Sequence, residues 1–220
     1  MKVFEQIKFY KKLYVKCKAS NSNFVLTFLR GFFIKLFYTK EIWMHNKTTI
    51  KNINNIEING RLFIGLNYVG FVNNTDSTFL NVKGKMQIEG DYIISRGCRI
   101  DIGENAILKI GKNGYVMPNT TFIVMNKVVI GDNCAISWDC QFLDDDLHQI
   151  NYEGKKESKS EIIIGDRVWI GCGVKIYKGS VIPNDTVIAS NSVVRGVFNL
   201  KNTIIAGHPA KVIKEKVTWK

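Results

Sequence analysis

The chain has 220 residues, enough for one domain with an appendage. Hydrophobic residues make up 45% of it and only three residues are Pro, so the composition excludes a chain without a folded core. The net charge of +12 favours an anionic partner such as a membrane surface or a phosphorylated small molecule. No aromatic-basic motif of a known nucleic-acid-binding module accompanies this charge, so we expect no nucleic acid partner.

Residues 1–48 differ from the rest of the chain and are predicted to form a helical appendage. The stretch 4–18 is rich in Lys with interleaved apolar residues, and the stretch 24–38 is mostly Phe and Leu. Arg30 and Lys35 interrupt the second stretch, which is too short and too charged to span a bilayer, and the lysines of the first argue against a signal peptide. Two helices are expected. They cap the domain that follows or pack on a neighbouring subunit, or they bind a membrane surface through residues 1–40, and these roles are compatible.

A six-residue repeat builds up through residues 49–142. Ile88, Ile94 and Ile100 keep a spacing of six, and later series keep it after slips of two residues. A strand repeats every two residues and a helix every 3.6, so a period of six indicates a short strand plus a turn, stacked on copies of itself. Three such hexads per turn predict a triangular coil whose turns lie about 4.8 Å apart. Corners with positive φ are expected at Gly90, Gly97, Gly103, Gly111 and Asn113-Gly114.

The repeat stops after Phe142, and residues 143–162 are predicted to form a loop extruded from the coil. Connections of this length are usually functional. The loop begins with three Asp and His148. If this start is extended, alternation places Asp144, Asp146 and His148 on one face. A metal site at these residues would have no second cluster of ligands, so we expect no metal.

The most regular stretch runs from Ile164 to Val194. Aliphatic residues occupy every sixth position, namely Ile164, Ile170, Ile176, Ile182, Ile188 and Val194. Four residues after each of the first five comes a small or β-branched residue, namely Val168, Val174, Ser180, Thr186 and Ser192. Chance spacing in an ordinary β-rich domain does not explain six hexads in phase. Residues 195–220 are expected to close the coil and to end in a short basic tail.

The cysteines indicate a reducing compartment. The five Cys are odd in number and lack a CxxC pair, and Cys98, Cys134 and Cys140 occupy the small-residue position of hexads. They are therefore interpreted as reduced core thiols of a cytoplasmic protein.

Several segments resemble the hexapeptide-repeat acyltransferases: IGDRVWIG at 164–171 and GHPAKVI at 207–213. ISWD at 136–139, followed by LDDDLH at 143–148, is similar to the branch that O-acetylates sugars of bacterial surface polysaccharides. The resemblance covers about residues 85–215. It implies an all-β fold, a left-handed parallel β-helix over residues 49–220, a homotrimer, and acetyl-CoA as donor. Periodicity alone does not fix the hand of the coil.

The same resemblance assigns site residues. His148 aligns with the catalytic His, and imidazole has the unperturbed pKa that suits a general base near neutral pH. Asp146, or else Asp144, is expected to fix its tautomer; a solvated acidic turn with an incidental His is the alternative. His45 and His208 are the other two histidines. The contacts to coenzyme A carry over by position to Trp169, Cys172, Ser190, Arg195, Lys211 and Lys214.

Two departures from the family pattern concern these cofactor contacts. Ala189-Ser190-Asn191 is bulkier than the usual Gly or Ala, and residues 197–200 replace a Pro-rich corner. Trp169 could instead make a subunit contact, and the three cations could form a solvated basic face.

These features predict an O-acetyltransferase that moves an acetyl group from acetyl-CoA to a sugar hydroxyl of a surface polysaccharide. It would work in the cytoplasm or peripherally on the inner face of the cytoplasmic membrane. One alternative is an acetyltransferase for a small soluble acceptor: an antibiotic, serine or an amino-sugar nucleotide. The other is a non-catalytic β-helix that binds glycans.

Overall fold

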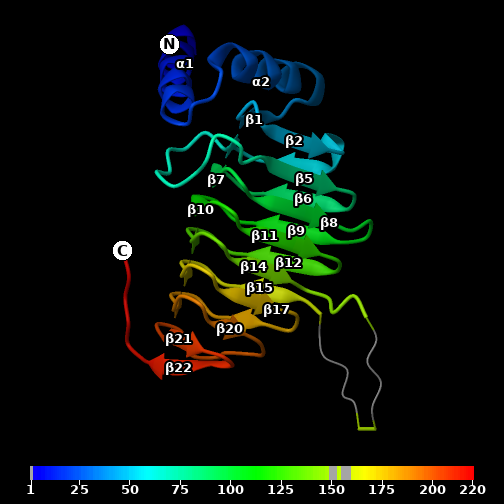
Figure 1. The fold of residues 1–220 in the computed structure, drawn as a ribbon, viewed down its shortest axis with the longest axis vertical. Coiled ribbons are helices and arrows are strands. Elements are labelled where there is room, and N and C mark those ends of the chain that lie inside the picture. The colour runs from blue at the N-terminus through cyan, green and yellow to red at the C-terminus, as the bar shows by residue number, and fades with distance from the viewer. Residues whose placement is uncertain (1, 149–152, 155–159) are drawn as a thin grey trace.

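The structure is a computed structural model that describes residues 2–148, 153–154 and 160–220 (Figure 1). Two helices come first, α1 (Lys2–Ala19) and α2 (Phe24–Tyr38). Within the described ranges the later regular elements are short strands, apart from one 3-10 turn at Ile53–Asn55. Among the helices in these ranges, none is long and apolar enough to cross a membrane.

The strands form three long sheets that run the length of a rod. In the described chain, sheet 1 contains β1 (Glu41–Met44), β4 (Arg61–Ile64), β7 (Tyr92–Ile94), β10 (Gly114–Val116), β13 (Ala135–Ile136), β16 (Trp169–Ile170), β19 (Val187–Ile188), β21 (Ile204–Gly207) and β22 (Ala210–Lys214). Sheet 2 contains β2 (Thr48–Lys51), β5 (Thr78–Val82), β8 (Arg99–Ile102), β11 (Thr121–Val124), β14 (Gln141–Leu143), β17 (Lys175–Tyr177) and β20 (Val193–Val194). Sheet 3 contains β3 (Ile56–Ile58), β6 (Lys85–Ile88), β9 (Ile107–Ile110), β12 (Lys127–Ile130), β15 (Ile162–Ile164) and β18 (Val181–Ile182).

The chain visits sheets 1, 2 and 3 in turn, so each coil has one strand per sheet and a corner after each strand. Neighbouring strands are parallel, except that β22 returns antiparallel to β21. Trp169 pairs with Val187, three hexads further along the chain, as the repeat predicts. The six aliphatic positions from Ile164 to Val194 and the five small positions between them are each at most 1% exposed. The predicted triangular coil with its interior ladder is therefore confirmed.

The glycines have a different role from the one predicted. Gly97 has a φ of +83° as expected, but positive φ was wrong for Gly90, Gly103 and Gly111. A Cβ at Gly111 would lie 2.4 Å from Asp132 Oδ1 and 2.6 Å from the backbone of Gly131, because the next coil passes close by. Polar residues supply many of the left-handed corners instead, among them Asn113, Asn119, Asn133, Asp139, Asp185 and Asn191.

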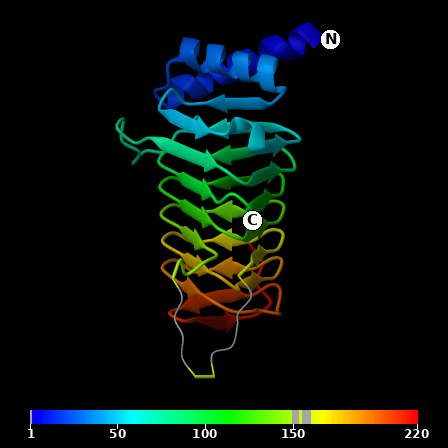
Figure 2. The same ribbon diagram turned by 90° about the vertical axis from the view of Figure 1, so that its right-hand side faces the viewer.

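Helices α1 and α2 lie at one end of the rod (Figures 1 and 2). The indole of Trp43 on β1 packs against Gly31 of α2, where an added Cβ would lie 2.4 Å from the ring. The Arg30 guanidinium donates to the carbonyls of His45, Asn46 and Thr48, at 3.3, 3.3 and 2.7 Å. Backbone carbonyls of the first coil are thereby satisfied, so α2 acts as the cap that an open end needs. The first strand, β1, already begins inside the 1–48 segment assigned to the appendage.

Candidate active site

The extruded loop leaves the rod at the corner between sheets 2 and 3. Strand β14 ends at Leu143 and β15 begins at Ile162, so the connection between these strands is residues 144–161. His148 is exposed, while residues 149–152 and 155–159 of the predicted loop lie outside the described residues. The strand-like alternation from 144 to 148 was wrong. Strand β14 stops before this segment, and Leu147 has a φ of +59°, which breaks an extended chain.

Asp144 anchors the start of this loop. Its side chain is completely buried, and its carboxylate accepts N–H bonds from Met125 at 2.7 Å and Asn126 at 2.9 Å. The Asn126 side-chain amide donates back to the Asp144 carbonyl at 3.2 Å. Burial raises the pKa of the Asp144 carboxyl, and the backbone N–H bonds only partly oppose this rise. Two backbone donors of the preceding coil thus occupy the Asp144 carboxylate.

Asp146 lies on the outer side of the same corner and is exposed. Its carboxylate is 2.5 Å from Lys178 Nζ and 3.8 Å from the Arg195 guanidinium. Lys178 follows β17 and Arg195 follows β20, so these cations stack on successive coils below the loop. Arg195 therefore lies beside the His148 loop, away from Lys211 and Lys214 on β22. Sequence reasoning missed Lys178. Its position one coil before Arg195 is the feature of the sequence that could have identified it.

Trp169 occupies the outer face of sheet 1 on β16 and is 43% exposed. Its indole Nε1 lies 3.4 Å from Ser137 Oγ, at the corner between sheets 1 and 2. At the same corner the Cys172 thiol donates to Ser190 Oγ at 3.2 Å, from one coil to the next. The structure therefore brings Trp169, Cys172 and Ser190 to one edge of the rod. Lys211 and Lys214 are exposed on β22, the last strand of sheet 1.

The predicted site residues are divided between two edges of the prism. His148, Asp146 and Arg195 belong to the corner between sheets 2 and 3. Trp169, Cys172 and Ser190 belong to sheet 1 and its corner with sheet 2. Sheet 2 lies between these edges. In the described part of one chain, the two groups therefore do not form a single site.

An aromatic pair extends the Trp169 edge toward the helical end of the rod. Phe71, in the loop between β4 and β5, packs edge-on against Trp138 with ring centroids 5.6 Å apart. Both rings are exposed, and Trp138 follows the Ser137 that contacts Trp169. The sequence gives no signal that Phe71 reaches a corner three coils further along the rod.

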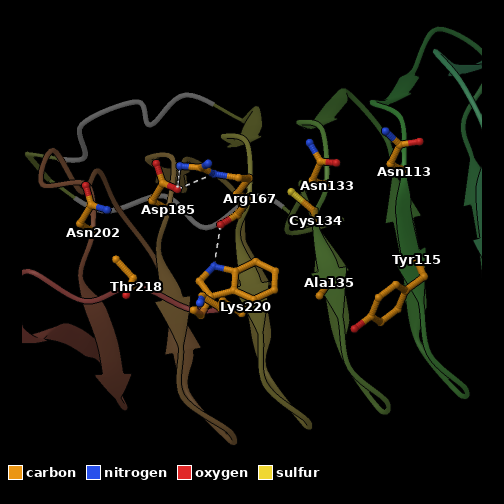
Figure 3. A pocket seen from close by; sticks show the side chains of 11 residues that line it. Asn113, Tyr115, Asn133, Cys134, Ala135, Arg167, Asp185, Asn202, Thr218 and Lys220 are labelled. Carbon is orange, nitrogen blue, oxygen red and sulfur yellow. Dashed lines mark hydrogen bonds and ion pairs between the residues drawn. The ribbon is translucent and has the colours of Figure 1, made fainter.

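A pocket of about 520 Å³ lies along sheet 1 and its corner with sheet 3 (Figure 3). Five corner residues with φ between +53° and +60° line it: Asn113, Asn133, Arg167, Asp185 and Asn202. The Arg167 Nε donates to Asp185 Oδ1 at 2.6 Å. Trp219 near the chain end donates its Nε1–H to the Arg167 carbonyl at 2.8 Å, and its ring is 6.2 Å from that of Trp169. Sequence reasoning missed this pocket, whose signal is a polar residue recurring at the turn position of the hexad.

The other histidines and the core thiols lie outside both groups of predicted site residues. His45 is 1% exposed and its Nδ1 accepts the Lys47 backbone N–H at 3.0 Å. His208 is exposed in the turn between β21 and β22. Burial raises the pKa values of the Cys98, Cys134 and Cys140 thiols to about 12, 11 and 12, which keeps them protonated and unreactive.

Three comparisons identify related proteins. The family model of the bacterial transferase hexapeptide, with six repeats, matches residues 161–196. A Klebsiella pneumoniae protein described as an uncharacterized 24.8 kDa protein in the cps region is 38% identical over 220 residues, covering 99% of this chain and 97% of that protein. The putative lipopolysaccharide biosynthesis O-acetyl transferase WbbJ of Escherichia coli K12 is 27% identical over 148 residues, 62% of this chain and 75% of WbbJ.

The crystal structure of the polySia-specific acetyltransferase NeuO superposes with a TM-score of 0.53 at 22% identity, covering 82% of this chain and 79% of NeuO. This likeness supports the fold, and the expected left-handed parallel β-helix is confirmed. The repeat match, the full-length relative and the fold agree with one another. The chain belongs to the hexapeptide-repeat acyltransferase family.

Proposed function

We propose that this protein transfers an acetyl group from acetyl-CoA to a sugar hydroxyl during surface polysaccharide biosynthesis, with His148 as general base. The observation that carries this proposal is the position of His148. A long loop interrupts the repeat between β14 and β15, and His148 is exposed at its start, where buried Asp144 ties the chain to the rod. The names of its relatives agree, since WbbJ is a putative lipopolysaccharide O-acetyl transferase and the Klebsiella relative lies in a cps region.

In this mechanism the His148 imidazole removes the proton from the acceptor hydroxyl. The oxygen attacks the thioester carbonyl and forms a tetrahedral intermediate. Backbone N–H groups stabilise the negatively charged oxygen of this intermediate. The intermediate then expels the CoA thiolate, and the imidazolium returns its proton to that sulfur. The reaction needs no covalent enzyme intermediate, which fits the buried state of Cys98, Cys134 and Cys140.

The two Asp residues have different parts in this proposal. Asp146 is exposed and lies two residues before His148. We therefore propose that Asp146 orients the His148 imidazole and stabilises the imidazolium. Its ion pair with Lys178 fixes the carboxylate at the corner. Asp144 is a positioning residue, because its carboxylate bonds to the backbone of Met125 and Asn126.

The cofactor site is assigned to the Trp169 edge. Trp169 walls the groove, and Cys172 and Ser190 contact the pantetheine arm. Lys211 and Lys214, on the last strand of sheet 1, meet the CoA phosphates, and Arg195 contributes from the other edge. Because sheet 2 separates Trp169 from His148 in one chain, a second copy must complete each site. We therefore propose a homotrimer in which each His148 loop faces the Trp169 edge of a neighbour.

The test is acetyl-CoA turnover, measured as free thiol release with a panel of sugars and lipid-linked oligosaccharides. His148→Ala should lose at least about 100-fold in turnover while still binding CoA. His208→Ala is the matched control, since His208 is also exposed and lies outside the proposed site, and it should retain full turnover. Equal thiol release by wild type and His148→Ala would remove His148 from the mechanism.

The acceptor panel also separates the alternatives. Turnover confined to an antibiotic, serine or an amino-sugar nucleotide would replace the polysaccharide acceptor with a small soluble one. Failure to bind CoA at all would leave a glycan-binding β-helix without catalysis.

A further inference from the structure

Helix α2 presents an uncharged apolar face to the outside. Thr27, Gly31 and Ile34 are its buried residues and face the first coil. Apolar residues that are 42–71% exposed cover the opposite side, namely Val25, Leu26, Leu29, Phe32, Phe33, Leu36 and Phe37. The two charges of this helix are used elsewhere, since Arg30 bonds to carbonyls and Lys35 pairs with Glu41 at 2.5 Å. A contiguous exposed apolar surface of this kind indicates a site of contact with a membrane or with another protein.

Helix α1 continues this apolar surface. Tyr14 stacks edge-on with Phe24 at 5.5 Å, and Tyr10 with Phe28 at 5.3 Å, so the two helices share one aromatic row. A wide groove of about 540 Å³ opens between them, lined by Ile7, Tyr10, Lys11, Tyr14, Val15 and Phe24. Both helices lie at the end of the rod opposite β21 and β22 (Figure 2).

The positive charge around this surface indicates which kind of partner binds to it. The first 40 residues contain nine Lys or Arg and a single acidic residue, Glu5, so they carry +8 of the net +12. Lys8, Lys11, Lys12 and Lys18 are exposed on α1. Two copies of such a surface repel each other, whereas an anionic lipid headgroup layer attracts both.

The dimensions decide how a bilayer would be engaged. Helix α2 has 15 residues, or about 22 Å, which is shorter than a hydrocarbon core of about 30 Å. Only one side of it is apolar and exposed, and the other is packed on the rod. A helix of this kind lies in the plane of the interface.

We propose that the outward surface of α1 and α2 binds the anionic face of a lipid bilayer. The apolar side chains of α2 enter the acyl boundary, and the lysines of α1 contact the headgroups. This binding is independent of the acetyl transfer proposed above, because it uses no residue of either candidate edge.

The experiment is co-sedimentation of the full-length protein with vesicles of phosphatidylcholine, with and without phosphatidylglycerol. We expect at least about tenfold tighter binding with phosphatidylglycerol, weakened by salt. Phe33→Ser combined with Phe37→Ser should abolish binding. The matched control combines Val197→Ser with Leu200→Ser, two exposed apolar residues at the opposite end of the rod, and should bind like wild type.

The charge contribution has its own pair of variants. Lys11→Gln with Lys12→Gln should weaken binding about 25-fold, at about fivefold per lysine near the surface. Lys83→Gln with Lys85→Gln removes the same charge from the side of the rod and should change binding far less. Thiol release with soluble acceptors should stay at the wild-type rate in the phenylalanine variant and in both lysine variants.

Three results would overturn the proposal. The first is equal binding to neutral and anionic vesicles, and the second is wild-type binding by the Phe33→Ser, Phe37→Ser variant. The third is a change of oligomeric state in that variant by analytical ultracentrifugation without vesicle binding by wild type, which would make a second copy the occupant.

Discussion

Asp144 is the residue whose substitution best separates anchoring from catalysis. Its carboxylate is buried and holds the N–H groups of Met125 and Asn126, at 2.7 and 2.9 Å. Asp144→Ala leaves both donors without an acceptor inside the corner. Each hydrogen bond to a charged group contributes about 1.5–3 kcal/mol, so the pair contributes about 3–6 kcal/mol.

The lower end of this range is expected for the Asp144→Ala variant. Burial raises the pKa of the Asp144 carboxyl, which means that the charge itself is disfavoured in this position. We therefore expect a loss of about 3 kcal/mol in the free energy of unfolding. For a chain of this size that corresponds to a fall in Tm of about 6–12 °C. Asp144→Asn keeps one acceptor oxygen, so it should lose about half as much.

The assay combines thermal unfolding with the pH profile of thiol release, measured well below the lowered Tm. Because Asp144 acts on the backbone, its variants should keep the wild-type shape of that profile. The reasoning is refuted if Asp144→Ala has the wild-type Tm but a displaced pH profile. Asp144 would then be the partner of the His148 imidazole.

Three further predictions concern the ends of the rod and the assembly. Burial, followed by the Arg96 guanidinium, lowers the pKa of His45 to about 4. The folded state therefore binds fewer protons than the unfolded state below pH 6.5, and the free energy of unfolding should fall by about 3 kcal/mol between pH 6.5 and pH 4. Urea unfolding measures this fall, which should be much smaller in His45→Gln. An unchanged slope in His45→Gln would assign the acid sensitivity to another group. Co-expressed His148→Ala and Trp169→Ala chains should regain about a quarter of wild-type turnover, because random mixing restores about one site in four. No recovery would place both residues in one chain's site. Lipid-linked glycans should be acetylated only above a threshold length, which a graded series of oligosaccharides would detect.

The interior of the rod could be predicted from sequence because its period is set by packing. Residues such as Ile170 and Ile176 must point inward at every sixth position, and their spacing is visible in one dimension. The corners could not be predicted in this way. Asp144 finds its partners at Met125 and Asn126 on the preceding coil, and the break in phase between them hides that proximity.

The division of the site could have been predicted by following the phase of the repeat. Cys172 and Ser190 are separated by three hexads and therefore share a corner, as their 3.2 Å contact shows. His148 lies one strand later in the coil than the corner of Ser137, so it belongs to the next edge. Family position assigns a role to each of these residues, but it does not tell which edge of the rod each one occupies. The surface of α2 was harder to predict, because its apolar pattern does not tell which side packs on Trp43.

The threshold length follows from the two ends of the molecule considered together. Five successive strands of sheet 2, from β2 to β14, are separated by four spacings of about 4.8 Å. The His148 loop therefore leaves the rod about 19 Å from the first coil. The helical layer adds about 10 Å. If α1 and α2 lie on a bilayer with the rod upright, His148 stands about 30 Å from the lipid surface. A single sugar on a lipid carrier cannot reach that height, whereas an extended oligosaccharide can. The threshold length should disappear in the Phe33→Ser, Phe37→Ser variant, because this variant does not bind the bilayer and reaches its acceptor from solution. Acetylation of the shortest lipid-linked sugars by membrane-bound wild type would contradict the upright arrangement.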